Sequence, residues 1–142
     1  PLETAQKILN TNIAGTFLFC REAVKLMKKN KTGRIVNFAT VASPLKLQGE
    51  AIYASSKAAV INFSQILAKE IGGFGITVNV VGPTPIKTDL IRKISDEKLN
   101  AVISSQAVQR FGEFQDVSNV VDFFIQPKSD FITGQVIYLG GI

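Results

Sequence analysis

The fold of this chain is decided by two short runs, Arg34-Ile-Val-Asn-Phe-Ala39 and Ile76-Thr-Val-Asn-Val-Val81. Both are rich in β-branched residues and apolar at most positions, which is typical of strands buried on both faces of a parallel sheet. The pattern changes on either side of them. Apolar residues recur every three or four positions over 3–29 and are frequent on most sides over 51–71, so a helix is predicted before each strand.

The second half of the chain continues this alternation. Short helices of mobile character are expected over 88–107, Asp116 is expected to cap a helix over 117–125, and 135–139 reads as a last strand. Alternating helices and strands predict an α/β fold class with a doubly wound parallel sheet. About three strands with flanking helices form one domain over 1–142, and one edge of this partial sheet would be unpaired.

Composition excludes several kinds of protein. Cys20 is the one cysteine, so no intrachain disulfide can form; it lies on the apolar stripe of the first helix and is expected in the core of a cytoplasmic protein. No histidine is present, which argues against a metal site. No apolar run approaches the roughly 18 residues that span a bilayer, so no membrane association is expected.

The formal net charge of +5 raises the question of nucleic acid. The densest basic stretch lies at the expected end of the first helix, where the helix dipole favours cations. No aromatic residues interleave with it and no nucleic-acid motif accompanies it, so no nucleic-acid partner is expected. Its members are Lys25, Lys28, Lys29, Lys31 and Arg34.

The chemistry centres on Tyr53-Ala-Ser-Ser-Lys57. Residues four apart on a helix share a face, so the phenol and the ammonium are expected to be neighbours. A phenol has a pKa of about 10, and a nearby ammonium should lower that pKa and make the tyrosine a usable acid or base. Taken alone, the motif is weak, because a Tyr–Lys packing pair would have the same spacing.

The surrounding residues raise the motif above chance. Thr40 follows the first strand and stands thirteen residues before Tyr53. Asn10-Thr-Asn-Ile-Ala-Gly15 lies upstream, and Ile132-Thr-Gly-Gln135 lies downstream, before the terminal Gly140-Gly141. In order and spacing, the whole chain resembles the compact single-domain branch of the short-chain dehydrogenase/reductase family. It looks closest to 3-oxoacyl-acyl-carrier-protein reductases, with an NAD(P)-binding Rossmann-like fold.

The resemblance implies a role for each of four residues. Tyr53 would protonate a ketone oxygen as hydride arrives, and Lys57 would lower the tyrosine pKa and bind the nicotinamide ribose. Asn12 would hold a water that links Lys57 to solvent. Thr40 occupies the place of the family's usual serine, keeping the hydroxyl but adding a methyl group. Ser43 is the alternative for that serine, although it matches a non-catalytic position.

The loop Gly82-Pro-Thr-Pro-Ile-Lys-Thr88 resembles the segment that covers the nicotinamide in this family. Pro83 begins it, backbone groups near Ile86 would face the carboxamide, and the Thr88 hydroxyl would reach the carboxamide or the pyrophosphate. The family usually has Pro-Gly where this chain has Pro83-Thr84, so a positive φ at Thr84 would be strained. The segment 88–107 resembles the substrate lid of the family.

The family's Gly-rich phosphate loop has no counterpart in this sequence. We therefore expect the chain to be the C-terminal portion of a longer domain, inactive alone, whose cofactor is NAD or NADP. The predicted function, when full length, is interconversion of a ketone and a secondary alcohol on a small-molecule substrate. A non-catalytic relative or fragment acting through subunit contacts remains the alternative, and a sugar-nucleotide epimerase or dehydratase is disfavoured by the strand at 76–81. The resemblance implies a homodimer or homotetramer.

Overall fold

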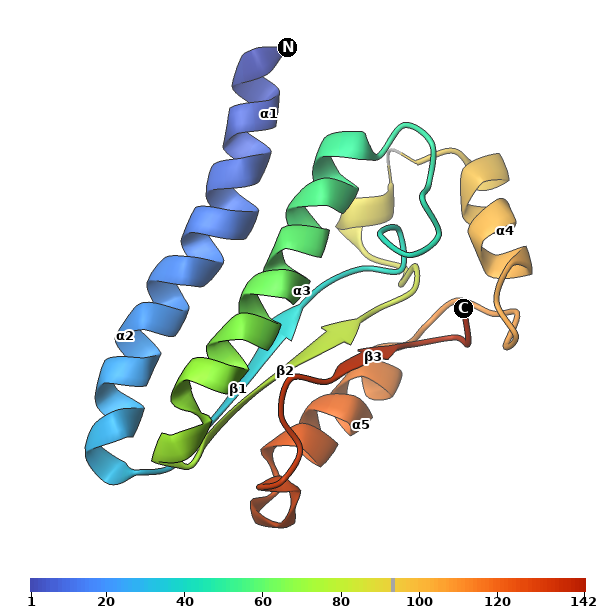
Figure 1. Ribbon diagram of the computed structural model, residues 1–142. Helices are drawn as coiled ribbons and strands as arrows, with labels where there is room; N and C mark the ends of the chain where they lie inside the picture. The colour runs from blue at the N-terminus through green and yellow to red at the C-terminus, as the bar shows by residue number, and fades with distance from the viewer. Residues whose placement is uncertain (93) are drawn as a thin grey trace.

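The computed structural model describes residues 1–92 and 94–142 and has the predicted α/β fold class, Rossmann-like in its parallel sheet. Three strands lie in the order β1-β2-β3, and all are parallel (Figure 1). They are β1 (Gly33–Phe38), β2 (Ile76–Gly82) and β3 (Val136–Tyr138). Each lies within a residue or two of its predicted bounds, and among the described residues β1 and β3 are the two edge strands of the sheet.

Helices cover both faces of the sheet. In Figure 1, α2 (Gly15–Asn30) and α3 (Ala51–Ile71) lie on one side of the strands and α5 (Phe114–Ile125) lies on the other. Every residue of β2 is buried, as a strand covered on both faces must be. Cys20 is part of the core between α2, α3 and the sheet, as predicted; the other buried members are Ile35, Ala68, Ile71, Ile76 and Val78.

The first predicted helix is not uniform. It consists of α1 (Leu2–Leu9), a π-helical turn over Asn10–Ala14, and α2. The prediction of one regular helix over 3–29 was therefore wrong at its middle. A π turn bonds each N–H to the carbonyl five residues earlier, and the Gly15 N–H accordingly donates to the Asn10 carbonyl. Such turns occur often at functional sites, and Asn12 lies at the centre of this one.

The segment after β2 contains the predicted short helices. A 3₁₀ turn covers Asp89–Ile91, and α4 (Asp96–Ser104) follows, with the Ser95 side chain accepting the Lys98 N–H as its cap. Position 93 of the predicted lid lies outside the described residues. Backbone bonds from Ala107 and Val108 to the Gly141 and Gly140 carbonyls, at 2.8 and 3.0 Å, tie the end of this segment to the C-terminus.

The start of α5 differs from its prediction. The helix begins at Phe114 and its N-cap is Glu113, not Asp116. Asp116 stands at the third helical position, where its carboxylate accepts the Glu113 N–H at 2.8 Å while the Glu113 side chain accepts the Asp116 N–H. This reciprocal capping box explains the error, because the sequence contains two acidic residues that could each cap the helix.

Within 1–92 and 94–142, no helix combines the length and the apolar character needed to cross a bilayer.

The two phenylalanines at opposite extremes of burial provide a test of the core. Phe124 is 0% exposed and Phe131 is 98% exposed. Phe124→Ala should lower the free energy of unfolding by about 3–5 kcal/mol, because it leaves a cavity under α5. Phe131→Ala should change it by less than about 0.5 kcal/mol. Urea denaturation followed by circular dichroism measures both, and equal effects would contradict this packing.

Candidate active site

The ends of two parallel strands bring the first site residues together. Thr40 follows β1 and Pro83 follows β2, and the Val41 N–H donates to the Pro83 carbonyl at 3.2 Å. The neighbouring bond from the Ala39 N–H to the Val81 carbonyl, at 2.8 Å, extends the strand pairing up to this point. Carboxyl ends of parallel strands meet at one edge of the sheet, which is where ligands bind in open α/β folds.

Tyr53 and Lys57 lie one turn apart on α3, and both are half-buried. The Lys57 Nζ donates to the carbonyl of Phe38, the last residue of β1, at 3.0 Å. A groove of about 300 Å³ also reaches this lysine, and its other lining residues include Thr11, Thr16 and Phe38. The lysine is therefore held at the end of β1 and is still reached by solvent.

Burial decides the protonation of the tyrosine. It raises the pKa of the Tyr53 phenol above its ordinary 10.0, and the negative charge of Glu50 adds to that rise. A hydrogen bond with the Thr40 hydroxyl acts in the opposite direction. Burial also lowers the pKa of the Lys57 ammonium from its ordinary 10.5. At neutral pH the phenol therefore keeps its proton and can act as an acid.

The expectation that Lys57 lowers the pKa of Tyr53 was wrong for this structure. Lys57 is not among the groups that act on the phenol, and the pKa of the phenol moves upward. The spacing of four residues places the two side chains on one face of α3. It does not fix where the long lysine chain ends, and here its ammonium reaches the Phe38 carbonyl instead.

Asn12 reaches α3 through a serine to which the sequence gave no role. The Asn12 Nδ2 donates to the Ser56 Oγ at 2.9 Å, and the Ser56 hydroxyl donates to the Tyr53 carbonyl at 2.7 Å. Ser56 is fully buried. A serine on the buried face of a helix was the signal that could have found it, because such a hydroxyl needs partners inside the protein.

Ser43, the alternative to Thr40, is buried and engaged elsewhere. Its hydroxyl donates to the Ala54 carbonyl at 2.9 Å, which ties the loop after β1 to the first turn of α3. The Thr40 hydroxyl accepts the Ala42 N–H at 3.3 Å and also contacts the Tyr53 phenol. Of the two hydroxyls, the structure brings the one of Thr40 to the tyrosine.

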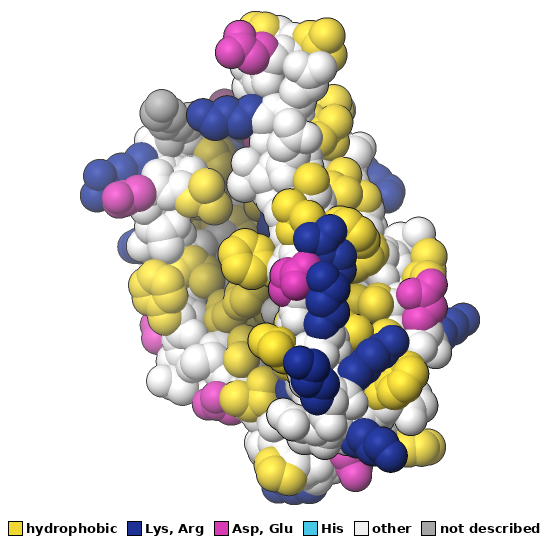
Figure 2. All heavy atoms as spheres, turned by 90° about the vertical axis from the view of Figure 1, so that its left-hand side faces the viewer, with side chains coloured by type: hydrophobic (Ala, Val, Ile, Leu, Met, Phe, Trp, Pro, Cys, Tyr) yellow, Lys and Arg dark blue, Asp and Glu magenta, His cyan; other side chains and the backbone are white. Residues whose placement is uncertain are grey.

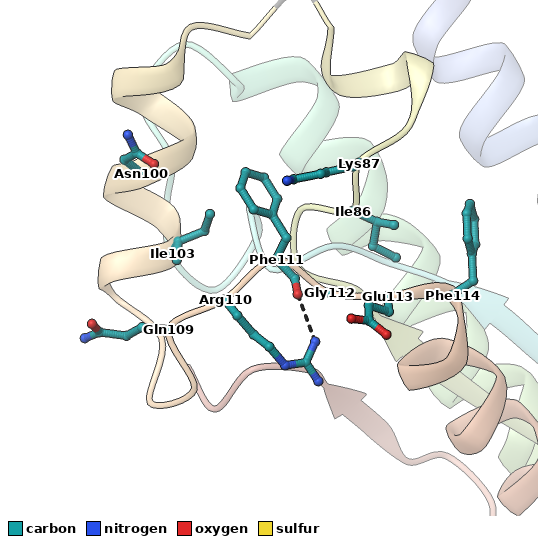
Figure 3. A pocket seen from close by; sticks show the side chains of 10 residues that line it. All are labelled: Ile86, Lys87, Asn100, Ile103, Gln109, Arg110, Phe111, Gly112, Glu113 and Phe114. Atoms are coloured by element: carbon teal, nitrogen blue, oxygen red, sulfur yellow. Dashed lines mark hydrogen bonds between the residues drawn. The ribbon is translucent and has the colours of Figure 1, made fainter.

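The loop after β2 leads away from this cluster toward a second cavity. Ile86 pairs with Gly112 in a short parallel bridge, and the Gly112 N–H donates to the Pro85 carbonyl at 2.9 Å. Figure 3 shows Ile86, Lys87 and Phe111 around a cavity of about 610 Å³ between this loop, α4 and the start of α5. Thr88 leads into the 3₁₀ turn over Asp89–Ile91, its carbonyl accepting the Ile91 N–H at 3.2 Å.

The anticipated strain at Thr84 does not arise. Among the described residues other than glycine, only Lys31 and Lys46 have positive φ. The threonine is buried instead, and its Oγ1 has no hydrogen-bond partner within the part of the chain that the structure describes. A buried hydroxyl without a partner is unusual, and it lies in the loop expected to face a cofactor.

In the described ranges on either side of position 93, no three or more His, Cys, Asp or Glu side chains gather as a metal site would need.

The electrostatics of Tyr53 can be measured directly. In a Tyr138→Phe background Tyr53 is the one remaining tyrosine, and its pKa should lie above 10.0 by ultraviolet titration. Thr40→Val should raise that pKa further, because it removes the hydrogen bond that opposes burial. Glu50→Gln should lower it, because a repelling charge disappears. A titration at or below 10.0, or shifts of the opposite sign, would contradict the account.

Known proteins resemble this chain along nearly its whole length. A family model described as enoyl-(acyl carrier protein) reductase matches residues 1–141. The 3-oxoacyl-[acyl-carrier-protein] reductase FabG of Escherichia coli strain K12 is 34% identical over 134 residues, which are 94% of this chain and 55% of that protein. The protein of the same name from Rickettsia felis is 34% identical over 139 residues, 98% of this chain and 58% of its own length.

The protein of that name from Vibrio cholerae is 32% identical over 134 residues. The chain thus spans between 55% and 58% of the length of these curated relatives. The match of the family model agrees with the parallel sheet and with the Tyr53–Lys57 helix. The chain therefore belongs to the short-chain dehydrogenase/reductase family.

Proposed function

We propose that the protein carrying these residues is an NAD(P)(H)-dependent oxidoreductase that interconverts a ketone and a secondary alcohol. The observation that carries the proposal is the phenol of Tyr53, which is half-buried, close enough to the Thr40 hydroxyl for it to act on the pKa of the phenol, and one turn from Lys57 on α3. The relatives named above are reductases of 3-oxoacyl groups on acyl carrier protein, so the proposed substrate class is a 3-oxoacyl thioester.

The direction of the tyrosine pKa favours the reductive reaction. A phenol that keeps its proton at neutral pH can donate it to a ketone oxygen as negative charge develops there. The Thr40 hydroxyl, already in contact with the phenol, would donate a second hydrogen bond to the same oxygen and orient it. In the reverse direction Tyr53 would accept the proton of the alcohol.

A nicotinamide cofactor, NAD or NADP, would supply the hydride when bound. Lys57 would hold its ribose, and Pro83, Ile86, Thr88 and Tyr53 would line the nicotinamide end. Two features fit such a group. The Lys57 ammonium is reached by an open groove, and the buried Thr84 hydroxyl has no partner in the described part of the loop. Asn12 would take part in returning a proton to Tyr53 by way of water and Lys57.

We propose a homodimer or homotetramer, formed through the outer faces of two helical segments. The first is α1 and α2 with the π turn between them, and the second is α3. Figure 2 shows hydrophobic side chains spread along the α1–α2 side, with a band of Lys and Arg over its lower part. Large apolar side chains are exposed there and on α3, among them Leu18, Leu26, Ile52 and Ile66. Burying such side chains between subunits is favourable, because it removes apolar area from water.

We place the protein in the cytoplasm, consistent with a single buried cysteine.

A second candidate is a non-catalytic member of the family that acts through subunit contacts. Two departures from the family pattern favour it: Thr40 stands where the family usually has a serine, and Thr84 stands where it usually has a glycine. A titration of cofactor fluorescence separates the candidates. Saturable binding of the reduced nicotinamide supports the enzyme, and the absence of binding supports the non-catalytic member.

Tyr53→Phe tests the proposed function in the longest natural polypeptide that contains these residues. Removing the phenolic hydroxyl should lower kcat for ketone reduction by about 10²–10⁴-fold, the usual contribution of a general acid. Cofactor affinity should stay within about two-fold, because the ring and the Lys57 side chain remain. Tyr138→Phe on β3, which removes the other phenol, is the matched control and should keep full activity. Retained turnover in Tyr53→Phe would refute the role.

A further inference from the structure

We propose that Ser56 is a positioning residue of the reaction, which fixes the Asn12 amide against the turn of α3 that carries Tyr53. The inference rests on the proposed function and adds a residue to it. Ser56 is 0% exposed, so its hydroxyl acts only through the groups that it contacts inside the protein. These are the side chain of Asn12, 44 positions away in sequence, and the backbone of Tyr53.

The direction of the two hydrogen bonds determines how the amide lies. A serine hydroxyl has one proton, and Ser56 donates it to the Tyr53 carbonyl at 2.7 Å. Its oxygen can then only accept from the other side, so the Asn12 amide must present its NH₂ group, at 2.9 Å. The Asn12 Oδ1 is thereby the acceptor that remains for a water or an ammonium. Ser56 thereby sets which end of the Asn12 amide can accept a hydrogen bond from the water that would link Lys57 to solvent.

The backbone of Asn12 is held at the same time. Its carbonyl accepts the Thr16 hydroxyl at 2.7 Å, within the π-helical turn over Asn10–Ala14. In this turn the Gly15 N–H bonds to the Asn10 carbonyl, five residues earlier, so the Thr16 hydroxyl is a side-chain contact added to the backbone pattern. Thr16 holds the backbone end and Ser56 holds the side-chain end, so the orientation of Asn12 is determined by the two together.

Ser56 thus forms a bridge, in which a buried serine accepts from an asparagine side chain and donates to a carbonyl of α3. The same helix contains a second bridge of this kind. Ser64, eight residues after Ser56 on the same buried face of α3, is also 0% exposed. Its hydroxyl donates to the Val60 carbonyl at 2.7 Å, and it accepts from the Asn37 Nδ2 at 2.8 Å. The two bridges are alike in burial and in bonding. Only the one at Ser56 ends on Asn12 and Tyr53, so Ser64 separates a positioning effect from a loss of stability.

The experiment compares Ser56→Ala with Ser64→Ala in the longest natural form of the protein. Each variant should lose a similar amount of thermal stability, because each removes one buried bridge. Ser56→Ala should lower kcat by about 5- to 30-fold, the equivalent of about 1–2 kcal/mol, with both KM values within about two-fold. Ser64→Ala should keep kcat and KM. Equal losses of kcat in the two variants, or none in Ser56→Ala, would overturn the proposal.

A double variant tests whether Ser56 acts through Asn12. If it does, Asn12→Ala/Ser56→Ala should be no slower than Asn12→Ala alone, because the amide that Ser56 orients is already gone. If the fold-loss of kcat in the double variant equals the product of the fold-losses in the two single variants, the proposal is overturned.

One readout does not depend on turnover. The side-chain NH₂ resonances of Asn12 should move in Ser56→Ala and stay in place in Ser64→Ala; unmoved resonances in Ser56→Ala would overturn the contact itself. If the resonances moved while Tyr53→Phe kept its activity, the proposed function would have failed. Ser56 would then be structural only, which also overturns the positioning role.

Discussion

The packing of α3 against the sheet is the constraint on which the site depends. Its buried face carries Ser56, Val60, Ser64 and Ala68, each four residues after the last, and all are at most 3% exposed. These side chains are small, so the helix can approach β1 and β2 closely. The two hydroxyls bond back to carbonyls of the helix itself, which avoids the cost of burying polar groups without partners. With this face fixed, Tyr53 and Lys57 are directed toward the carboxyl ends of the strands.

The raised pKa of the Tyr53 phenol favours one direction of the proposed reaction, the reduction of a ketone. The sequence suggested a tyrosine made acidic by the neighbouring lysine. In the structure, burial raises the pKa of the Tyr53 phenol, which keeps it protonated, and lowers the pKa of the Lys57 ammonium. A neutral phenol beside the Thr40 hydroxyl suits protonation of a ketone, where a bound substrate meets a donor that still holds its proton. The negative charge of Glu50 also raises the pKa of the Tyr53 phenol.

Much of the fold could be predicted because its signals are local. Both long strands were found from their apolar β-branched runs, and α3 was predicted at its observed bounds, 51–71. The π turn was missed because residues 10–14 keep the apolar periodicity of a regular helix, and its difference lies in backbone bonds alone. The cap of α5 was misplaced because Glu113 and Asp116 bond reciprocally.

The site was predictable in its residue types more than in its contacts. Spacing placed Tyr53 and Lys57 on one face of α3, and the strand end placed Thr40 near them. The contact between the Lys57 ammonium and the Phe38 carbonyl depends on the path of a flexible side chain, which no spacing determines. The bridge through Ser56 joins residues 44 positions apart and needs the packed structure to be seen.

The central claim is that the Tyr53 phenol donates the proton during ketone reduction. The most direct measurement follows the Tyr53 Cζ resonance of ¹³C-labelled protein with pH in the cofactor complex, beside the pH profile of the reduction rate in the same complex. The account predicts that the rate falls as pH rises through the pKa at which this resonance titrates, because only the protonated phenol is an acid. A rate that is unchanged through that pKa, or that falls at one where Tyr53 does not titrate, would contradict it.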